Sequence, residues 1–225
     1  MALDIRTASE HAMNPGGAGA ATATPGKRTL VEAARADRRT LSGAAWCAKY
    51  PTGKTIADLR DASFKADVQA FHDAMVAAAT PANALHISIS ATYRPIERAH
   101  LMHYCYNVHS GAVSVAAANA ASAAAGIAIN WDHGNDATSR AKAGEMVTGY
   151  AIAFAPALVS RHTEGKAIDW NLTWTGSLRI AKKGESHKLD CTGTGTSSAN
   201  LHAVGASYGV HKLATDPPHW SSDGH

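Results

Sequence analysis

Residues 160–169 read Ser-Arg-His-Thr-Glu-Gly-Lys-Ala-Ile-Asp, of the form SxHxxGxAxD, and this stretch gives the strongest indication of how the chain folds. If the chain turns at Gly165 and straightens toward Asp169, the imidazole of His162 and the carboxylate of Asp169 can converge on one cation. Gly165 and Ala167 then let the backbone pass close to that site. A catalytic zinc ion takes three protein ligands and leaves its fourth position to water, so a second histidine is needed.

Residues 216–220 read Asp-Pro-Pro-His-Trp and supply that second histidine, His219, together with the carboxylate of Asp216 three residues before it. Pro217 and Pro218 each have φ fixed at about −65°, which stiffens the segment between the side chains of Asp216 and His219. Both side chains can therefore be aimed at one site with little loss of conformational entropy.

A third segment, residues 84–92, reads ALHISISAT, in which apolar and polar residues alternate as they do in a half-buried strand. Tyr93 and Arg94 follow it directly, and Pro95 then stands where a helix can begin. We therefore expect Tyr93 and Arg94 at the junction between a strand and a helix.

These three segments together resemble the zinc D-Ala-D-Ala carboxypeptidase and L-alanyl-D-glutamate endopeptidase family, whose fold is shared with the Hedgehog signalling domain. The resemblance implies that His162, Asp169 and His219 bind Zn²⁺. It also implies that Asp216 is the general base, and that Arg94 reaches the active site and steadies the carbonyl oxygen as it becomes an oxyanion.

Four other residues are candidates for contact with the substrate: Ser160, Tyr93, Trp220 and His133. Ser160 can equally cap a loop, and Trp220 can equally belong to the core. His133 follows Asp132 in a loop that could form a competing site, although we interpret this loop as a turn with a structural role.

Most of the 13 histidines take no metal role in this interpretation. His100 and His103 share one face of a predicted helix and His109 lies six residues further on, which is a spacing that suits a solvated face better than a metal site. His225 is expected to be disordered.

The pattern of apolar residues predicts an α+β fold, in which helices pack around a small antiparallel sheet. The family resemblance implies that this fold is of the Hedgehog and D,D-peptidase type. The predicted helices cover residues 56–79, 96–108, 113–127, 141–153 and 198–208, the last with Ser198 as its cap and Gly209 as its stop. The predicted strands cover residues 84–92, 166–172 and 210–213, with a hairpin over 175–197.

Composition sets the domain organisation. Residues 1–28 are rich in Gly, Ala, Thr and Pro and predict a flexible leader, and residues 29–36 could form a short helix. Residues 29–225 then form a single domain, with the family resemblance strongest over 46–225. Hydrophobic residues make up 45% of the chain and charged residues 17%, which excludes a wholly disordered protein.

The net charge and the cysteine content exclude several classes of protein. The chain has a formal net charge of only +3 and no cluster of basic residues like the basic stripe of a nucleic-acid-binding protein. Cys47, Cys105 and Cys191 form no CxxC pair, which excludes a thiolate zinc ribbon and a disulfide-dense scaffold and leaves their redox state open. No apolar stretch is long enough for a membrane span.

The resemblance implies a monomeric zinc peptidase that hydrolyses stem-peptide bonds of bacterial peptidoglycan. The bond can be L-Ala-D-Glu, as in the endopeptidases, or one cut by a D,D-carboxypeptidase or D,D-endopeptidase; Asp rather than Glu at position 216 slightly favours the phage endopeptidase branch. The alternative is a non-catalytic, zinc-stabilised binding module of the same fold, which would have no need for the carboxylate of Asp216.

The first residues show no secretory signal, so we expect synthesis in the cytoplasm and action on the cell wall after non-classical release. A phage lysin released by a holin and a payload of a contractile injection apparatus both fit this expectation.

Overall fold

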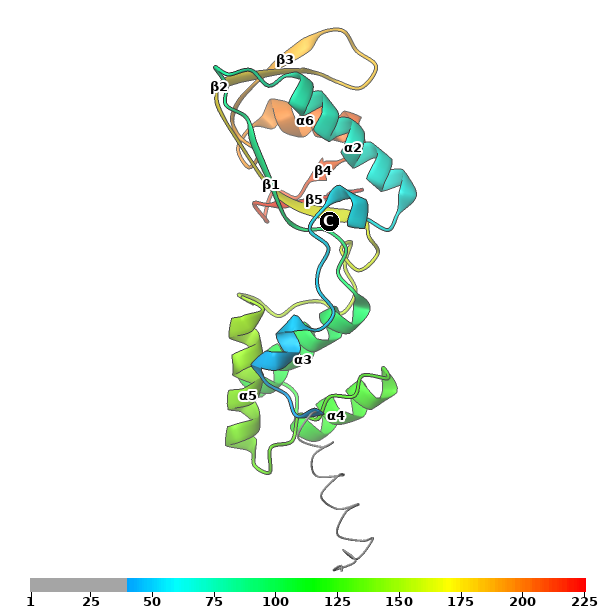
Figure 1. Ribbon diagram of the computed structural model, residues 1–225, viewed down its shortest axis with the longest axis vertical. Coiled ribbons are helices and arrows are strands. Elements are labelled where there is room, and N and C mark those ends of the chain that lie inside the picture. Colours follow the sequence, from blue (N-terminus) through cyan, green and yellow to red (C-terminus); the bar gives the residue numbers. More distant parts are fainter. Residues whose placement is uncertain (1–39) are drawn as a thin grey trace, which may run out of the picture. The chain divides into compact units, whose positions relative to one another are not determined.

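The structure is a computed structural model that describes residues 40–225 (Figure 1). The predicted leader over 1–28, the short helix over 29–36 and the start of the predicted domain lie outside the described residues. Within residues 40–225 the chain has five α-helices and one antiparallel sheet of five strands, which confirms the predicted α+β class. No helix in this part of the chain is long and apolar enough to cross a membrane.

The helices are α2 (Ala62–Ala77), α3 (Ile96–Ser110), α4 (Val115–Ala124), α5 (Asp136–Gly149) and α6 (Ala199–Ser207), with short 3₁₀ turns η1 (Ala44–Ala48) and η2 (Ile56–Asp58). The strands are β1 (His86–Ala91), β2 (Ala167–Ala181), β3 (Lys188–Thr194), β4 (His211–Lys212) and β5 (His219–Ser221).

Capping side chains explain where several helices begin. Ser198 accepts a hydrogen bond from the backbone of Leu201, as predicted for the start of α6. The predicted helix over 56–79 is instead η2 followed by α2, because Asp61 accepts from Phe64 and starts a new helix there. The predicted helix over 141–153 begins earlier, at Asp136, because Asn135 caps its first turn, and it ends at Gly149.

Strand β2 is the centre of the sheet. Its first half pairs with β1 on one side and β5 on the other, and its second half pairs with β3, so that the strand predicted over 166–172 continues to Ala181. The register of β5 places Asp169 opposite His219 and Ile168 opposite Trp220. The sequence predicted no strand at β5, and this pairing brings two distant segments side by side.

Two separate groups of buried side chains form the interior. We call the first the sheet core, because it consists mainly of residues from β2, α2 and α6; its buried members are Leu59, Phe64, Val68, Phe71, Met75, Ile168, Trp170, Leu172, Leu178, Ile180, Cys191, Leu201, Val204, Val210 and Trp220. We call the second the helical core, because it consists mainly of residues from α3, α4, α5 and the loops beside them; its buried members are Trp46, Leu101, Cys105, Val108, Ala118, Ile127, Ile129, Trp131, Ala143, Met146 and Tyr150.

Candidate metal centre

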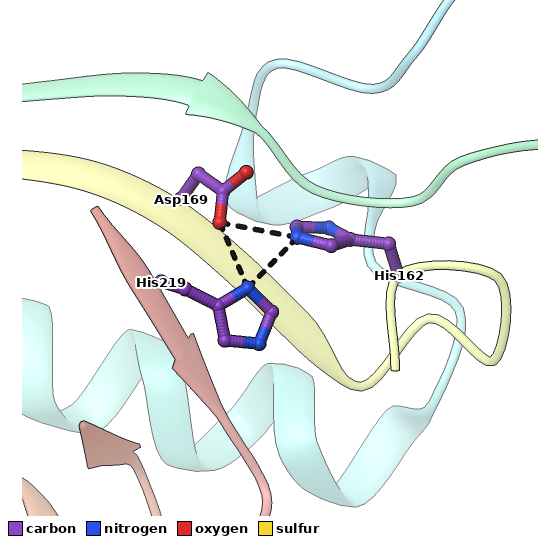
Figure 2. Close-up of side chains that lie close together, drawn as sticks. All are labelled: His162, Asp169 and His219. Atoms are coloured by element: carbon purple, nitrogen blue, oxygen red, sulfur yellow. Dashed lines mark hydrogen bonds and ion pairs between the residues drawn. The ribbon is translucent and has the colours of Figure 1, made fainter. Parts of the chain in front are cut away.

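His162, Asp169 and His219 point toward one another at one end of the sheet (Figure 2). Asp169 lies on β2 and His219 on β5, and they face each other because directly paired residues of neighbouring strands project to the same side. His162 comes from the turn that precedes β2. The structure therefore brings together the three residues that the sequence predicts as metal ligands.

The turn before β2 depends on Gly165. The backbone N–H of Gly165 donates to the carbonyl oxygen of His162, 3.2 Å away, and Gly165 has a φ of 72°. A Cβ atom at this position would lie 2.6 Å from the Cβ of Arg60, so a larger residue would displace the turn. The chain thus turns at Gly165, as predicted, and carries His162 back toward the start of β2.

The three inward-facing atoms have the spacing of metal ligands. His162 Nε2 lies 3.1 Å from Asp169 Oδ1 and 3.1 Å from His219 Nδ1, and His219 Nδ1 lies 3.0 Å from Asp169 Oδ1. Ligand atoms of tetrahedral zinc lie about 3.3 Å apart, given bonds of about 2.0–2.2 Å. Small outward shifts would therefore let the three atoms share one ion.

Hydrogen bonds on the outer side of each imidazole determine which nitrogen carries the proton. His162 Nδ1 lies 2.6 Å from the carbonyl oxygen of Thr92, and His219 Nε2 lies 3.1 Å from the main-chain oxygen of His225. Since these oxygens only accept, both outer nitrogens must donate, and in the neutral rings the inner nitrogens are left with lone pairs. Two nitrogen lone pairs and a carboxylate then face one another with no proton between them, an arrangement that a cation stabilises.

The electrostatics of the metal-free triad agree with this arrangement. Burial acts to raise the pKa of Asp169, but hydrogen bonds and charge from His162 and His219 outweigh it and hold that pKa well below its usual range. Burial likewise acts to lower the pKa of His219, and Asp169 outweighs it, so that pKa is raised. When the metal is absent, a proton on His219 occupies the place that a metal ion would fill. Protons and metal ions therefore compete for His219.

The triad lies on the wall of a cavity of about 500 Å³ that Arg94 and Asp216 also line. The backbone N–H of Arg94 donates to the carbonyl oxygen of His162, 3.0 Å away. Its guanidinium makes no hydrogen bond or ion pair with any other residue of 40–225, and burial lowers its pKa against the opposing charge of Asp169. Asp216 is exposed, and its charge helps to raise the pKa of His219.

The four predicted substrate contacts lie in different places. Ser160 lines the cavity, and its buried Oγ has no hydrogen-bond partner among the described residues. Tyr93 does not line this cavity; the guanidinium of Arg60 lies over its ring at 5.1 Å.

Trp220 belongs to the sheet core and is fully buried, so the prediction that it contacts substrate is wrong. Successive residues of a strand face opposite sides, and since His219 faces the cavity, Trp220 faces the interior. There it packs against Phe71 and Trp170, at ring-centroid distances of 5.8 and 6.3 Å.

His133 lies outside the cavity too, and the structure does not support its assignment as a substrate contact. Its Nε2 is 3.0 Å from Ser42 Oγ, and its backbone N–H donates to Ser139. Asp132 accepts from the backbone of Gly134, so the loop is a turn, as the preferred interpretation had it.

Two contributions to the site come from main-chain oxygens that side-chain patterns do not indicate, those of Thr92 and His225. The expectation that His225 is disordered is wrong, because its main-chain oxygen contacts His219 and the residue lines the cavity. No motif in the sequence could have indicated either oxygen.

Comparisons with models of protein families, with curated proteins and with solved structures give no match to this chain. Over residues 40–225, His162, Asp169 and His219 are the one group of three or more His, Cys, Asp or Glu residues whose ligand atoms lie within 4.8 Å of one another. This buried group can hold a metal ion.

Proposed function

We propose that the protein is a zinc-dependent peptidase that hydrolyses stem-peptide bonds of bacterial peptidoglycan. One observation carries the proposal: three ligand atoms with inward lone pairs converge beside a cavity that an exposed carboxylate, Asp216, and an unpaired guanidinium, that of Arg94, also line. A binding module stabilised by zinc would need the three ligands but neither of these two groups.

The donor set fits zinc, since two imidazoles and one carboxylate are common ligands of catalytic zinc sites. The same set also binds non-haem iron(II) in oxygenases. We favour zinc because a free carboxylate and a cation beside the ligands serve hydrolysis, in which a proton is moved and negative charge develops on oxygen. Measuring the metal content of the purified protein distinguishes the two ions.

Zinc held by His162, Asp169 and His219 would lower the pKa of a water molecule to about 7 and polarise the scissile carbonyl. Asp216, on the cavity wall, accepts the proton of the attacking water and returns it to the leaving amine. Arg94 donates hydrogen bonds to the carbonyl oxygen as it gains charge, a contribution of about 2.7–4 kcal/mol by analogy with other oxyanion donors.

A second cavity gives the substrate room beyond the scissile bond. It has a volume of about 580 Å³ and shares Arg94 and Asp216 with the first cavity. Its wall includes Phe154, a residue that is 85% exposed in an apolar loop over residues 151–159. An exposed apolar wall suits a peptide that carries alanine methyl groups, as the peptidoglycan stem does.

The test is digestion of purified peptidoglycan with the zinc-loaded protein, with and without a chelator, followed by mass assignment of the new termini. A new D-Glu amino terminus identifies the L-Ala-D-Glu endopeptidase, and loss of terminal D-Ala identifies the D,D-carboxypeptidase. The matched control is Asp216→Asn, which should bind zinc and release product far more slowly than wild type. If the zinc-loaded wild type gives no chelator-sensitive product, the proposed activity is wrong.

Delivery to the cell wall through a holin or through a contractile injection apparatus is part of this proposal. Co-expression with a holin tests the first route, since lysis that requires both proteins is expected if it is used.

A further inference from the structure

The outer hydrogen bond of His219 is made by a short segment that follows it in sequence, residues 221–225. We infer that this segment, held by an ion pair between Arg161 and Asp223, is a positioning device that sets the tautomer of His219 so that its Nδ1 faces the metal. The inference rests on the proposed metal site and adds to it residues outside the ligand set, namely Arg161 and the segment 221–225.

The hydrogen bond itself decides which nitrogen of His219 can bind metal. The main-chain oxygen of His225 lies 3.1 Å from Nε2 and can only accept, so the proton of the neutral ring stays on Nε2. The lone pair is then on Nδ1, the atom 3.0 Å from Asp169 Oδ1. Outer partners of this kind orient metal-binding imidazoles generally.

The hydroxyl of Ser221 holds the backbone of the segment in a tight turn. Ser221 Oγ accepts from the backbone N–H of Gly224 at 2.9 Å and from that of His225 at 3.0 Å. Gly224 has a φ of 80°, a conformation that glycine adopts without strain. The turn carries the main-chain oxygen of His225 back to the ring of His219.

A pair of hydrogen bonds from Arg161 to Asp223 anchors this turn to the segment that carries the first ligand. Arg161 Nε donates to Asp223 Oδ1 at 3.1 Å, and its Nη2 donates to the other carboxylate oxygen. Its Nη1 donates to Glu164 at 2.6 Å, so the guanidinium lies between two carboxylates. Because Arg161 immediately precedes His162, one side chain connects the segments that hold two of the three ligands.

The Arg161–Asp223 ion pair fixes the position of the segment 221–225 and adds little to the stability of the fold. About a third of each side chain is exposed, 33% for Arg161 and 36% for Asp223, and exposed ion pairs add little to the free energy of folding. Paired fork-like hydrogen bonds do fix geometry. Disrupting the pair should therefore leave the fold intact and loosen the outer hydrogen bond of His219.

The test compares zinc affinities of the full chain by competition with a chromogenic chelator, for wild type, Asp223→Ala and Arg161→Gln. We expect zinc to bind both variants about 10–100-fold more weakly, the usual cost of losing an outer partner. The matched control is Asp190→Ala, which breaks the Arg179–Asp190 pair on the β2–β3 hairpin and should leave zinc affinity unchanged. Thermal unfolding of the metal-free forms checks that each variant is folded.

A second readout follows the tautomer directly. Long-range ¹H–¹⁵N spectra of the metal-free protein at a pH where His219 is neutral should show the proton on Nε2 in wild type and a mixture of tautomers in Asp223→Ala. Folded variants that bind zinc as tightly as wild type, or whose His219 tautomer is unchanged, would overturn the inference. Peptidoglycan digestion is a separate measurement, so wild-type protein that binds zinc without hydrolysis would contradict the proposed activity and leave this inference standing.

Discussion

The sheet core and the helical core both lie beside buried histidines, yet these histidines have different roles. Beside the sheet core, His162 and His219 direct bare nitrogens at a shared point with Asp169. Beside the helical core, His100 is also buried, not solvated as predicted, and its Nε2 is 3.0 Å from Ser122 Oγ. His103 has its own partner too, the carbonyl oxygen of Pro156 at 2.8 Å.

Convergence of lone pairs, not burial or histidine content, therefore distinguishes the candidate metal site from the other buried histidines. The two cores also differ in how they are built. The helical core joins helices that follow one another along the chain, whereas the sheet places His162 next to His219, 57 residues away. We call the elements around the sheet core the sheet part and those around the helical core the helical part. A bound ion should therefore stabilise the sheet part against unfolding and leave the stability of the helical part unchanged.

The largest expected effect follows from removing a ligand. In His162→Ala the cation keeps only two protein ligands, so zinc affinity should fall by more than about 100-fold, the upper end of the cost of losing an outer partner, and hydrolysis should stop. His133→Ala, which changes a histidine beside the helical core, is the control and should bind zinc normally. Equal loss in both variants would remove the distinction between the two parts.

The next effect separates catalysis from metal binding within the sheet part. Asp216→Asn should lower turnover by about 10²–10⁴-fold, the usual contribution of a general base, with zinc content unchanged. The measurement is single-turnover hydrolysis with parallel metal analysis. Asp132→Asn, in the loop near the helical core, should turn over like wild type, and an unimpaired Asp216→Asn enzyme would exclude the proposed base.

Two buried thiols report on the two parts separately, because Cys191 belongs to the sheet core and Cys105 to the helical core. Burial raises the pKa of Cys191 to about 11 and that of Cys105 to about 12, so at pH 8 neither reacts until its surroundings open. Free zinc at about 100 times its Kd should slow alkylation of Cys191 by about 100-fold, equivalent to about 2.7 kcal/mol.

Cys105 should be labelled at the same rate with zinc and with chelator, as mass spectrometry of the alkylated peptides would show. Equal protection of both thiols would mean that the two parts open together.

The two parts should also respond to pH in opposite directions when metal is absent. Although burial acts to lower the pKa of His219, Asp169 raises it, so its stabilising contribution is complete below about 6.5 and is lost as the pH rises through the folded-state pKa. Burial lowers the pKa of His100, so its contribution is present above about 6.5 and is lost as the pH falls.

Hydrogen exchange with chelator at pH 5.5 and 8, corrected for intrinsic rates, measures this difference. Peptides from β2 and β5 should be relatively better protected at the lower pH and peptides from α3 at the higher pH. If the protection of all these peptides changed with pH in the same direction, the predicted opposite responses of the two parts would be wrong.

Much of this architecture could be predicted because its signals are local in sequence. Strand alternation located β1. The turn at Gly165 and the stiff Pro217–Pro218 linker indicated that the three side chains can converge, and the family resemblance implied that they are ligands. Strand β5 was missed because its three residues are too few to show a period, and without β5 the inward direction of Trp220 could not be known. The oxygens of Thr92 and His225 were missed because every residue has one, and only the fold selects which of them contacts an imidazole.

The most direct test is an anomalous difference map at the zinc edge from crystals of the zinc-loaded protein. The account predicts a peak within about 2.0–2.2 Å of His162 Nε2, Asp169 Oδ1 and His219 Nδ1, the bond lengths of protein-bound zinc. A peak at Asp132 and His133, or at one of the cysteines with the triad empty, would contradict it.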